Sequence, residues 1–347
     1  MMIRTREQKI IDFIEKTGAC SSKEIFDAAN ISVSYATLKR VLAKLVSEKY
    51  ISTQGNKRGT KYQISPVCKI IRPVDPAEYF KKEIDERDIK ETFDFAIINE
   101  IFVKTSVFTD NELTKLNELQ LLFQNNIAQL SLNEYKKEFE RLAIDLSWKS
   151  SQIEGNTYSL LETEKLLKEK ETASGKTKEE AIMLLNHKEA LDFIMENPDY
   201  LYTLSVSKIE DIHGILTKEL NVERNLRNRR VGISGTNYRP LDNEFQIREA
   251  LQDACRLINS KESVFEKAFL ALVLISYIQP FMDGNKRTAR IVSNAILINE
   301  KHCPLSFRTV ESIDYKKAIL LFYEQNNIYR FKEIFINQFE FAVNTYF

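Results

Sequence analysis

The chain has 347 residues and a formal net charge of zero, with 43% hydrophobic and 29% charged residues. This balance predicts ordinary globular cores, and the length predicts two domains. Four widely spaced cysteines and only three histidines argue against a disulfide framework or a zinc site. Residues 1–8 are charged, and the most apolar stretch, 268–278, is too short to cross a bilayer. These features argue against a signal peptide and a membrane span, so we expect a cytoplasmic protein.

The N-terminal part of the chain is basic. Residues 1–65 hold twelve Lys and Arg against six Asp and Glu, which gives this part a net charge of +6 and leaves −6 for the remainder. Apolar residues at helical spacing predict helices over 6–17 and 34–50. A capping box of Ser21 and Glu24 predicts the start of a short helix between these two helices. The excess of positive charge suggests a surface that faces nucleic acid.

Two short strands are predicted after these helices. They cover residues 50–53 and 61–64 and flank a basic, glycine-rich turn. Three helices followed by such a hairpin resemble a winged helix-turn-helix, an α+β domain that we place at residues 1–65. Winged helices also dock other proteins, so both DNA and protein remain open as partners. The candidate DNA contacts are Lys39, Arg40, Lys44, Lys57 and Arg58.

The rest of the chain is expected to be mostly helical. Residues 66–130 are predicted as a linker and a helical connecting region, and residues 131–347 as a helical domain. A capping box of Ser207 and Glu210 is expected at one helix start. The predicted helices of this domain cover about 133–153, 178–197, 206–220, 246–259, 263–278, 286–300 and 312–324, with one more at the C-terminus.

Two segments of this helical domain, taken by themselves, indicate local structure but no specific function. Gly155 is a stop signal for the helix predicted to end near residue 153, and Glu154 beside it is by itself an ordinary surface carboxylate. Residues 230–241 contain two glycines and a proline around β-branched residues, which predicts a hairpin or a loop.

The run from Gln279 to Arg290 carries the most specific chemistry. Gly284 can adopt a positive φ that points consecutive N–H groups into one concavity, and the predicted helix after it directs its positive dipole end to the same place. Arg287 and Arg290 lie three residues apart, so both can reach an anion there. Asp283 has the wrong charge for phosphate but suits a divalent cation that bridges phosphates. These features together predict a Mg-nucleotide site.

This run resembles the signature loop of the Fic (Fido) family, His-Pro-Phe-x-Asp/Glu-Gly-Asn-Gly/Lys-Arg-x-x-Arg, at every position except the first. The resemblance implies a mainly α fold, a Fic-type helical bundle with a small β-hairpin flap. It also implies that AMP is transferred from ATP to a hydroxyl of a target protein. The implied phosphate-binding residues are Gly284, Asn285, Lys286, Arg287 and Arg290, with Asp283 for Mg²⁺.

Two other segments extend the resemblance in the order expected for the family. The run that contains Ser150, Glu154 and Gly155 is similar to its inhibitory motif, which lies N-terminal to the core here. The resemblance implies that Glu154 pairs with Arg290 and blocks the γ-phosphate, since both anions compete for one guanidinium. In the family, a flap holds the target's backbone, and the implied flap residues are Val231, Gly232, Ile233, Ser234 and Tyr238.

Gln279 stands where the family has its catalytic histidine. A glutamine amide cannot act as a general base, whose loss costs ~10²–10⁴-fold in rate. A natural pseudoenzyme, an engineered inactivation and a reaction without a base remain open. Two functions therefore compete: an impaired protein adenylyltransferase inhibited by Glu154, and a DNA-binding regulator that senses nucleotide without turnover. An interaction module is a third, and the identity of the target and the formation of a homo-oligomer stay open.

Overall fold

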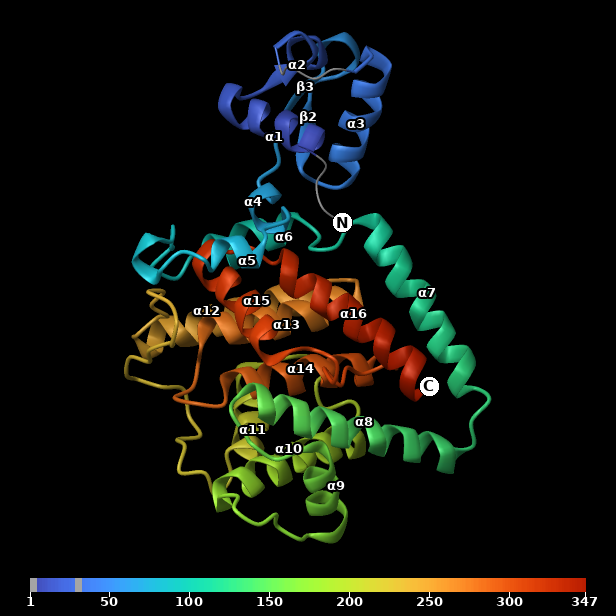
Figure 1. Cartoon of the computed structure of the whole chain (residues 1–347), viewed down its shortest axis with the longest axis vertical. Helices are drawn as coiled ribbons and strands as arrows, with labels where there is room; N and C mark the ends of the chain where they lie inside the picture. The colour runs from blue at the N-terminus through green and yellow to red at the C-terminus, as the bar shows by residue number, and fades with distance from the viewer. Residues whose placement is uncertain (1–4, 29–32) are drawn as a thin grey trace.

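The computed structural model describes residues 5–28 and 33–347, while 1–4 and 29–32 lie outside the described residues. Figure 1 shows a small N-terminal domain at one end of the molecule and a larger helical part beneath it. The side chains of Thr5 and Arg58 are likewise outside the described set.

The N-terminal domain combines three helices with a small antiparallel sheet. Its helices are α1 (Thr5–Thr17), α2 (Ser22–Ala28) and α3 (Tyr35–Ser47), and its strands are β1 (Cys20–Ser21), β2 (Ile51–Gln54) and β3 (Lys61–Ile64). The strand order is β1-β3-β2, and Ile51 lies opposite Ile64. The expected capping box is present, because Ser21 N donates to Glu24 and Glu24 N donates to Ser21 Oγ. The sequence prediction missed strand β1.

The connecting region is less helical than predicted. Only short turns occupy it before residue 110, and a long helix begins there because Thr109 and Glu112 form a capping box. Its elements are α4 (Cys68–Ile71), α5 (Pro76–Tyr79), a 3₁₀ turn (Ile84–Glu86), a π-helical turn (Ile97–Ile101), α6 (Phe102–Lys104) and α7 (Asp110–Ile127).

The C-terminal part is a helical bundle, which confirms the mainly α fold class. Its helices are α8 (Leu132–Ile153), α9 (Leu160–Glu169), α10 (Lys178–Glu196), α11 (Val206–Leu216), α12 (Glu244–Ser260), α13 (Val264–Ile278), α14 (Asn285–Asn299), α15 (Ser312–Gln325) and α16 (Tyr329–Tyr346). Helix α9 was not predicted. The capping prediction at α11 was wrong: Ser205, rather than Ser207, accepts a hydrogen bond from Lys208 N.

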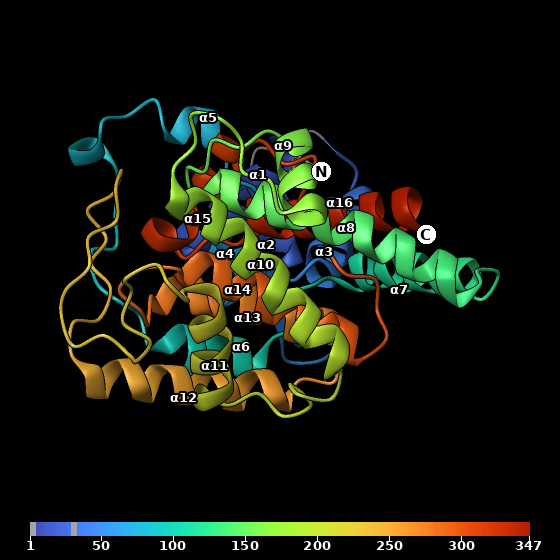
Figure 2. The ribbon, with the colours of Figure 1, turned by 90° about the horizontal axis from the view of Figure 1, so that it is seen from below.

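Helix α13 forms the centre of this bundle. Its apolar residues extend around the whole helix, so nearly all its side chains are buried, as expected for a helix enclosed by others. It packs against α12, α14 and α15, and Figure 2 shows α13 and α14 together in the middle of the bundle. Within the described chain, no helix has the length and apolar character needed to cross a membrane.

Candidate active site

The loop between α13 and α14 is fixed by two left-handed residues. Gln279 ends α13 with φ 51°, and Gly284 precedes α14 with φ 79°. A Cβ atom on Gly284 would lie 3.3 Å from Thr217 Cγ2 and 3.4 Å from His213 Nε2. Both the backbone conformation and the close neighbours therefore require glycine, which keeps the backbone of the loop close to α11.

Asn285 and His213 hold this loop from within. Asn285 Oδ1 accepts from Phe281 N at 2.8 Å, and its Nδ2 donates to Phe281 O and Gln279 Oε1. The ring of His213 stacks on Phe281 at 3.7 Å, and burial lowers the pKa of His213 to about 4. The side chain of Asn285 is thus engaged inside the loop.

Two buried arginines lie one helical turn apart on α14. Arg287 Nη2 lies 3.2 Å from Asp283 Oδ2, while the buried Nε and Nη1 of Arg287 have no hydrogen-bond partner among the described residues. Buried guanidinium groups normally bond all their donors, so these atoms indicate the place of an anion. Arg290 is fully buried, and its guanidinium lies over the ring of Tyr315.

The carboxylate of Glu154 forms an ion pair with the second arginine, Arg290. Its Oε1 lies 2.8 Å from Arg290 Nη2, and its Oε2 lies 3.2 Å from Lys286 Nζ. Ser150 adds to this pairing, since Arg290 Nε donates to its Oγ at 2.8 Å. Burial alone would raise the pKa of Glu154, but the charges of Arg290 and Lys286 outweigh it and lower the pKa to about 2. Gly155, with φ 104°, follows the end of α8 at this point.

The amide of Gln279 is held by neighbours on three helices, and the residue is only 8% exposed. Its Nε2 donates to Ser276 O at 2.6 Å and to Tyr323 Oη at 3.0 Å, and Tyr323 Oη in turn donates to Ser276 O at 2.7 Å. Its Oε1 accepts from Asn285. The Gln279 side chain therefore stabilises the end of α13 and has little freedom to contact a ligand.

The expected β-hairpin flap is an irregular loop. Residues 231–238 contain no strand, and the segment forms one isolated bridge, between Arg239 and Thr92. Tyr238 is wrongly predicted as a target-facing residue: it is 2% exposed, it stacks on Tyr277, and its hydroxyl donates to Tyr277 O.

A cavity of about 430 Å³ brings most of the predicted residues together. It lies between the flap, the end of α8, the loop and α15. Sequence analysis missed its α15 side, because those residues follow only an ordinary apolar helix pattern and no motif marks them. The cavity is lined by Ile153, Glu154, Val231, Gly232, Ile233, Ser234, Gln279, Met282, Asp283, Gly284, Asn285, Lys286, Ile313, Lys316, Ile319, Leu320 and Tyr323.

The candidate DNA contacts of the N-terminal domain differ in exposure and pairing. Lys39 and Arg40 are exposed on α3, and Lys57 is exposed in the turn between β2 and β3. Lys44 was predicted to contact DNA but forms ion pairs with Glu7 at 2.7 Å and Glu48 at 3.7 Å, which places it toward the connecting region. The side chain of Arg58 lies outside the described residues.

Comparisons with known proteins identify a family domain in part of the chain. Residues 203–297 match the Fic/DOC family. A protein adenylyltransferase Fic from Nematostella vectensis is 29% identical over 179 residues, which are 48% of this chain and 40% of that protein. The match therefore spans less than half of the length of that relative.

Solved structures show the same fold. Fic-1 from C. elegans has a TM-score of 0.59 at 20% identity, over 68% of this chain and 72% of that one. A Fic domain-containing signalling protein from Bacteroides thetaiotaomicron has a TM-score of 0.54 at 18% identity, over 70% and 94%. A Fic family protein from Desulfovibrio desulfuricans G20 has a TM-score of 0.57 at 17% identity, over 69% and 74%.

Proposed function

We propose that this chain, in which residues 203–297 form a Fic/DOC family domain, is a protein adenylyltransferase that Glu154 inhibits and that Gln279 impairs. The substrate is ATP, and the acceptor is a hydroxyl of a target protein. One observation carries this proposal. Two buried arginines follow the glycine turn at the start of α14, and a carboxylate from another helix occupies the second of them.

The phosphates of ATP fit the start of α14. Gly284 opens the backbone there, so the first N–H groups and the positive end of the helix face the cavity. The unpartnered Nε and Nη1 of Arg287 supply two buried donors of the right charge. Lys286 borders the cavity and adds a second positively charged side chain.

Mg²⁺ fits Asp283. The side chain of this residue is 69% exposed, and within the described residues only its Oδ2 is paired, with Arg287 at 3.2 Å, so oxygen lone pairs remain for a hard cation. Asp283 would hold the ion beside the phosphates, where it would offset their negative charge. No cluster of three or more metal-ligating side chains occurs within the described ranges, so the ion would depend on the phosphates for the rest of its ligands.

Inhibition follows from competition for Arg290. A γ-phosphate and the carboxylate of Glu154 are both anions, and one guanidinium cannot form its best bonds with both. Because its pKa is about 2, Glu154 stays charged at every physiological pH and keeps this position. Release of inhibition therefore requires movement of α8 or of the Glu154 side chain, rather than protonation.

Gln279 limits the rate of AMP transfer. In AMP transfer, the target oxygen forms a bond to the α-phosphorus, the bond to pyrophosphate breaks, and the hydroxyl proton must pass to an acceptor. The amide of Gln279 cannot take that proton, and its own hydrogen bonds hold it against Ser276 and Tyr323. We therefore expect nucleotide binding with transfer slower by ~10²–10⁴-fold than a positioned base would give.

Calorimetric titration with ATP and Mg²⁺ tests the site. We expect Glu154→Gly to bind ATP more tightly than the unchanged protein, because Arg290 becomes free for phosphate. Adding Arg287→Ala to this variant should weaken binding by about 1.5–3 kcal/mol, the value of a hydrogen bond to a charged group. Arg230→Ala, in an exposed flap arginine that pairs with Asp242, is the matched control and should change little.

Two results would contradict the assignment. Equal ATP affinity with and without Arg287 would place the nucleotide elsewhere. Equal affinity and equal bound geometry with and without Glu154 would leave this residue as a surface carboxylate with no inhibitory role.

A second candidate function rests on the N-terminal domain. Residues 5–64 have the element order of a winged helix-turn-helix, and α3 presents Lys39 and Arg40 between the small exposed residues Ala36 and Ala43. Small side chains beside cations let a helix approach DNA closely while phosphates are neutralised. Together with the held amide of Gln279, this surface supports a nucleotide-sensing DNA-binding regulator as the alternative to an enzyme, ahead of a plain interaction module.

A further inference from the structure

The C-terminal end of α15 contacts several distant parts of the chain. Glu324, which is fully buried, accepts hydrogen bonds from Tyr79 Oη at 2.7 Å and Arg87 Nη1 at 3.1 Å. The backbone continues this contact, since Lys90 N donates to Glu324 O at 2.8 Å. The neighbouring Tyr323 bonds to Gln279 in the candidate site. The last turn of α15 thus joins the connecting region to the α13–α14 loop.

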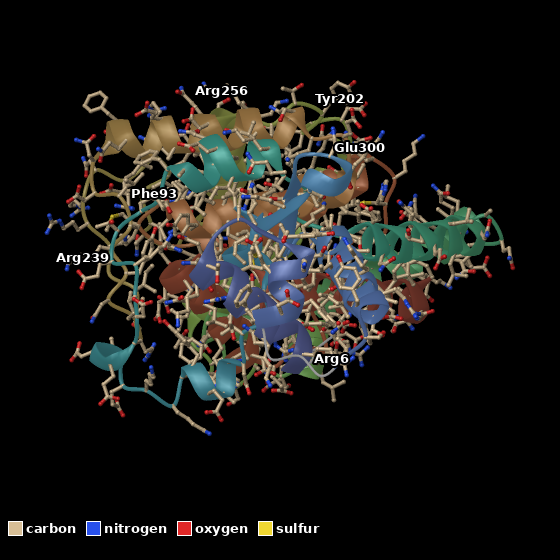
Figure 3. The ribbon with its side chains drawn as sticks, turned by 90° about the horizontal axis from the view of Figure 1, so that it is seen from above. Arg6, Phe93, Tyr202, Arg239, Arg256 and Glu300 are labelled. Carbon is tan, nitrogen blue, oxygen red and sulfur yellow. The ribbon has the colours of Figure 1, made fainter. Side chains whose placement is uncertain are left out.

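Residues 79–94, which we name the strap, run along the outside of the flap. Figure 2 shows the two segments side by side at one edge of the molecule, and Figure 3 labels Phe93 of the strap and Arg239 of the flap at that edge. Thr92 and Arg239 form a parallel bridge. The other contacts are Arg87 Nη1 to Gly235 O at 3.1 Å, Asn237 Nδ2 to Asp85 Oδ1 at 3.1 Å, and Arg239 N to Glu91 O at 2.7 Å.

Arg87 is the residue where these contacts meet. Its side chain is 9% exposed and lies between the carboxylate of Glu324 and the carbonyl of Gly235, so it ties the flap to α15. Its Nε also donates to Lys82 O at 3.2 Å, which fixes the guanidinium in one orientation. A planar group with several fixed donors suits such a junction better than a flexible ammonium.

The two sides of the flap have different neighbours: the outer side contacts the strap, and the inner side borders the cavity. The strap contacts the flap at Gly235, Asn237 and Arg239, while residues 231–234 border the cavity. We propose that the strap holds the outer side of the flap so that 231–234 face the cavity, and that Arg87 is the positioning residue of this arrangement. The functional meaning rests on the proposed function: the strap would govern how the target is held and leave nucleotide binding unchanged.

Hydrogen–deuterium exchange of the full chain tests this proposal. Arg87→Ala removes a charge-assisted hydrogen bond to the flap, so we expect amide exchange over 231–241 to accelerate by about tenfold or more. Arg87→Lys keeps the charge and should recover part of the protection. Arg230→Ala changes a flap arginine that pairs with Asp242 and should leave exchange unchanged.

A second variant separates flap positioning from general stability, because Arg87→Ala leaves Glu324 buried without its cation. Asn237→Ala with Arg239→Ala removes the side-chain bond of Asn237 to Asp85 and the ion pair of Arg239 with Glu91, and leaves the Arg87–Glu324 pair intact. Faster exchange confined to 231–241 in this variant, at an unchanged melting temperature, would support the proposal. Unchanged flap exchange in this folded variant would overturn it, as would acceleration spread equally over the whole bundle.

ATP titration of the same variants keeps the two proposals apart. Loss of flap protection with full ATP affinity is the expected result. If the unchanged protein does not bind ATP but the strap variants still show faster flap exchange, the nucleotide assignment is wrong. The proposal for the strap would still hold. Weakened ATP binding in the strap variants would contradict a role confined to the target side.

Discussion

Glu154 Oε1 lies 2.8 Å from Nη2 of the fully buried Arg290, so a carboxylate at the end of α8 pairs with a guanidinium of α14. These two residues are 136 positions apart in the chain. Their pairing links the end of α8, where Gly155 follows, to the start of α14, where Gly284 precedes the helix. It also gives the site a dependence on pH that can be measured.

The free energy of unfolding should depend on Glu154 in a defined pH window. The pKa of Glu154 falls from an ordinary 4.5 to about 2 on folding, so its charge stabilises the folded state above pH 4.5. That stabilisation is lost as the pH falls from 4.5 toward 2. Urea unfolding should therefore show Glu154→Gln less stable by about 1.5–3 kcal/mol near pH 7, with the difference shrinking toward pH 2. A difference that stays constant over this range would contradict the ion pair.

Replacement of Gly284 should destabilise the loop. Gly284→Ala places a Cβ atom at φ 79° and 3.3 Å from Thr217, so we expect a loss of about 1–2 kcal/mol from the left-handed conformation alone. Gly232→Ala is the matched control, because it has no positive φ and no neighbour within 4 Å. Thermal unfolding should lower the melting temperature of the first variant only. Equal melting temperatures would mean that the loop adapts without cost.

The sequence predicted the parts of the site that are local. The residues of the α13–α14 loop act within one short segment, and a capping box such as Ser21 with Glu24 depends only on near neighbours. Pairing of Glu154 with Arg290 was also predicted, but from a family resemblance rather than from spacing. A single sequence therefore predicts directly only those features that depend on residues close together in the chain.

The missed features all depend on distant contacts. Gln279 meets Tyr323 across 44 positions, and Arg87 meets Gly235 across 148. Helical periodicity shows which face of α15 is apolar, but not which loop that face will meet. Tyr238 was predicted to face the target because the family resemblance places it in the flap, whereas stacking on Tyr277 buries it. Only the packing of the whole bundle decides between these outcomes.

DNA binding should depend on α3 and not on every basic residue of the domain. Lys39→Ala with Arg40→Ala in the full chain should weaken binding to duplex DNA and lower its dependence on salt, because fewer phosphates are neutralised. Lys44→Ala is the control: it breaks ion pairs with Glu7 and Glu48, so it should affect stability more than DNA affinity. Gel shifts at two salt concentrations measure both. No shift at low salt would favour a protein-docking domain instead.

The chemistry itself is tested at Gln279. Gln279→His combined with Glu154→Gly should restore AMP transfer if the missing base is the only defect. Histidine tolerates the left-handed backbone that this position requires, at φ 51°, and its imidazole can accept the hydroxyl proton. The second change frees Arg290, so that ATP can bind with its α-phosphate open to attack. Labelling from α-labelled ATP should exceed that of the Glu154→Gly variant by roughly 10²–10⁴-fold.

The dependence of this labelling on pH separates a restored base from a structural effect. An imidazole must be neutral to accept a proton, so labelling by the double variant should rise as the pH passes through about 6.5 and then level off. The Glu154→Gly variant, which lacks the imidazole, should show no such rise. Background labelling in both variants, with ATP still bound, would mean that more than the base has been lost. The protein would then be a nucleotide-binding regulator, with the amide of Gln279 serving to hold α13 against Tyr323.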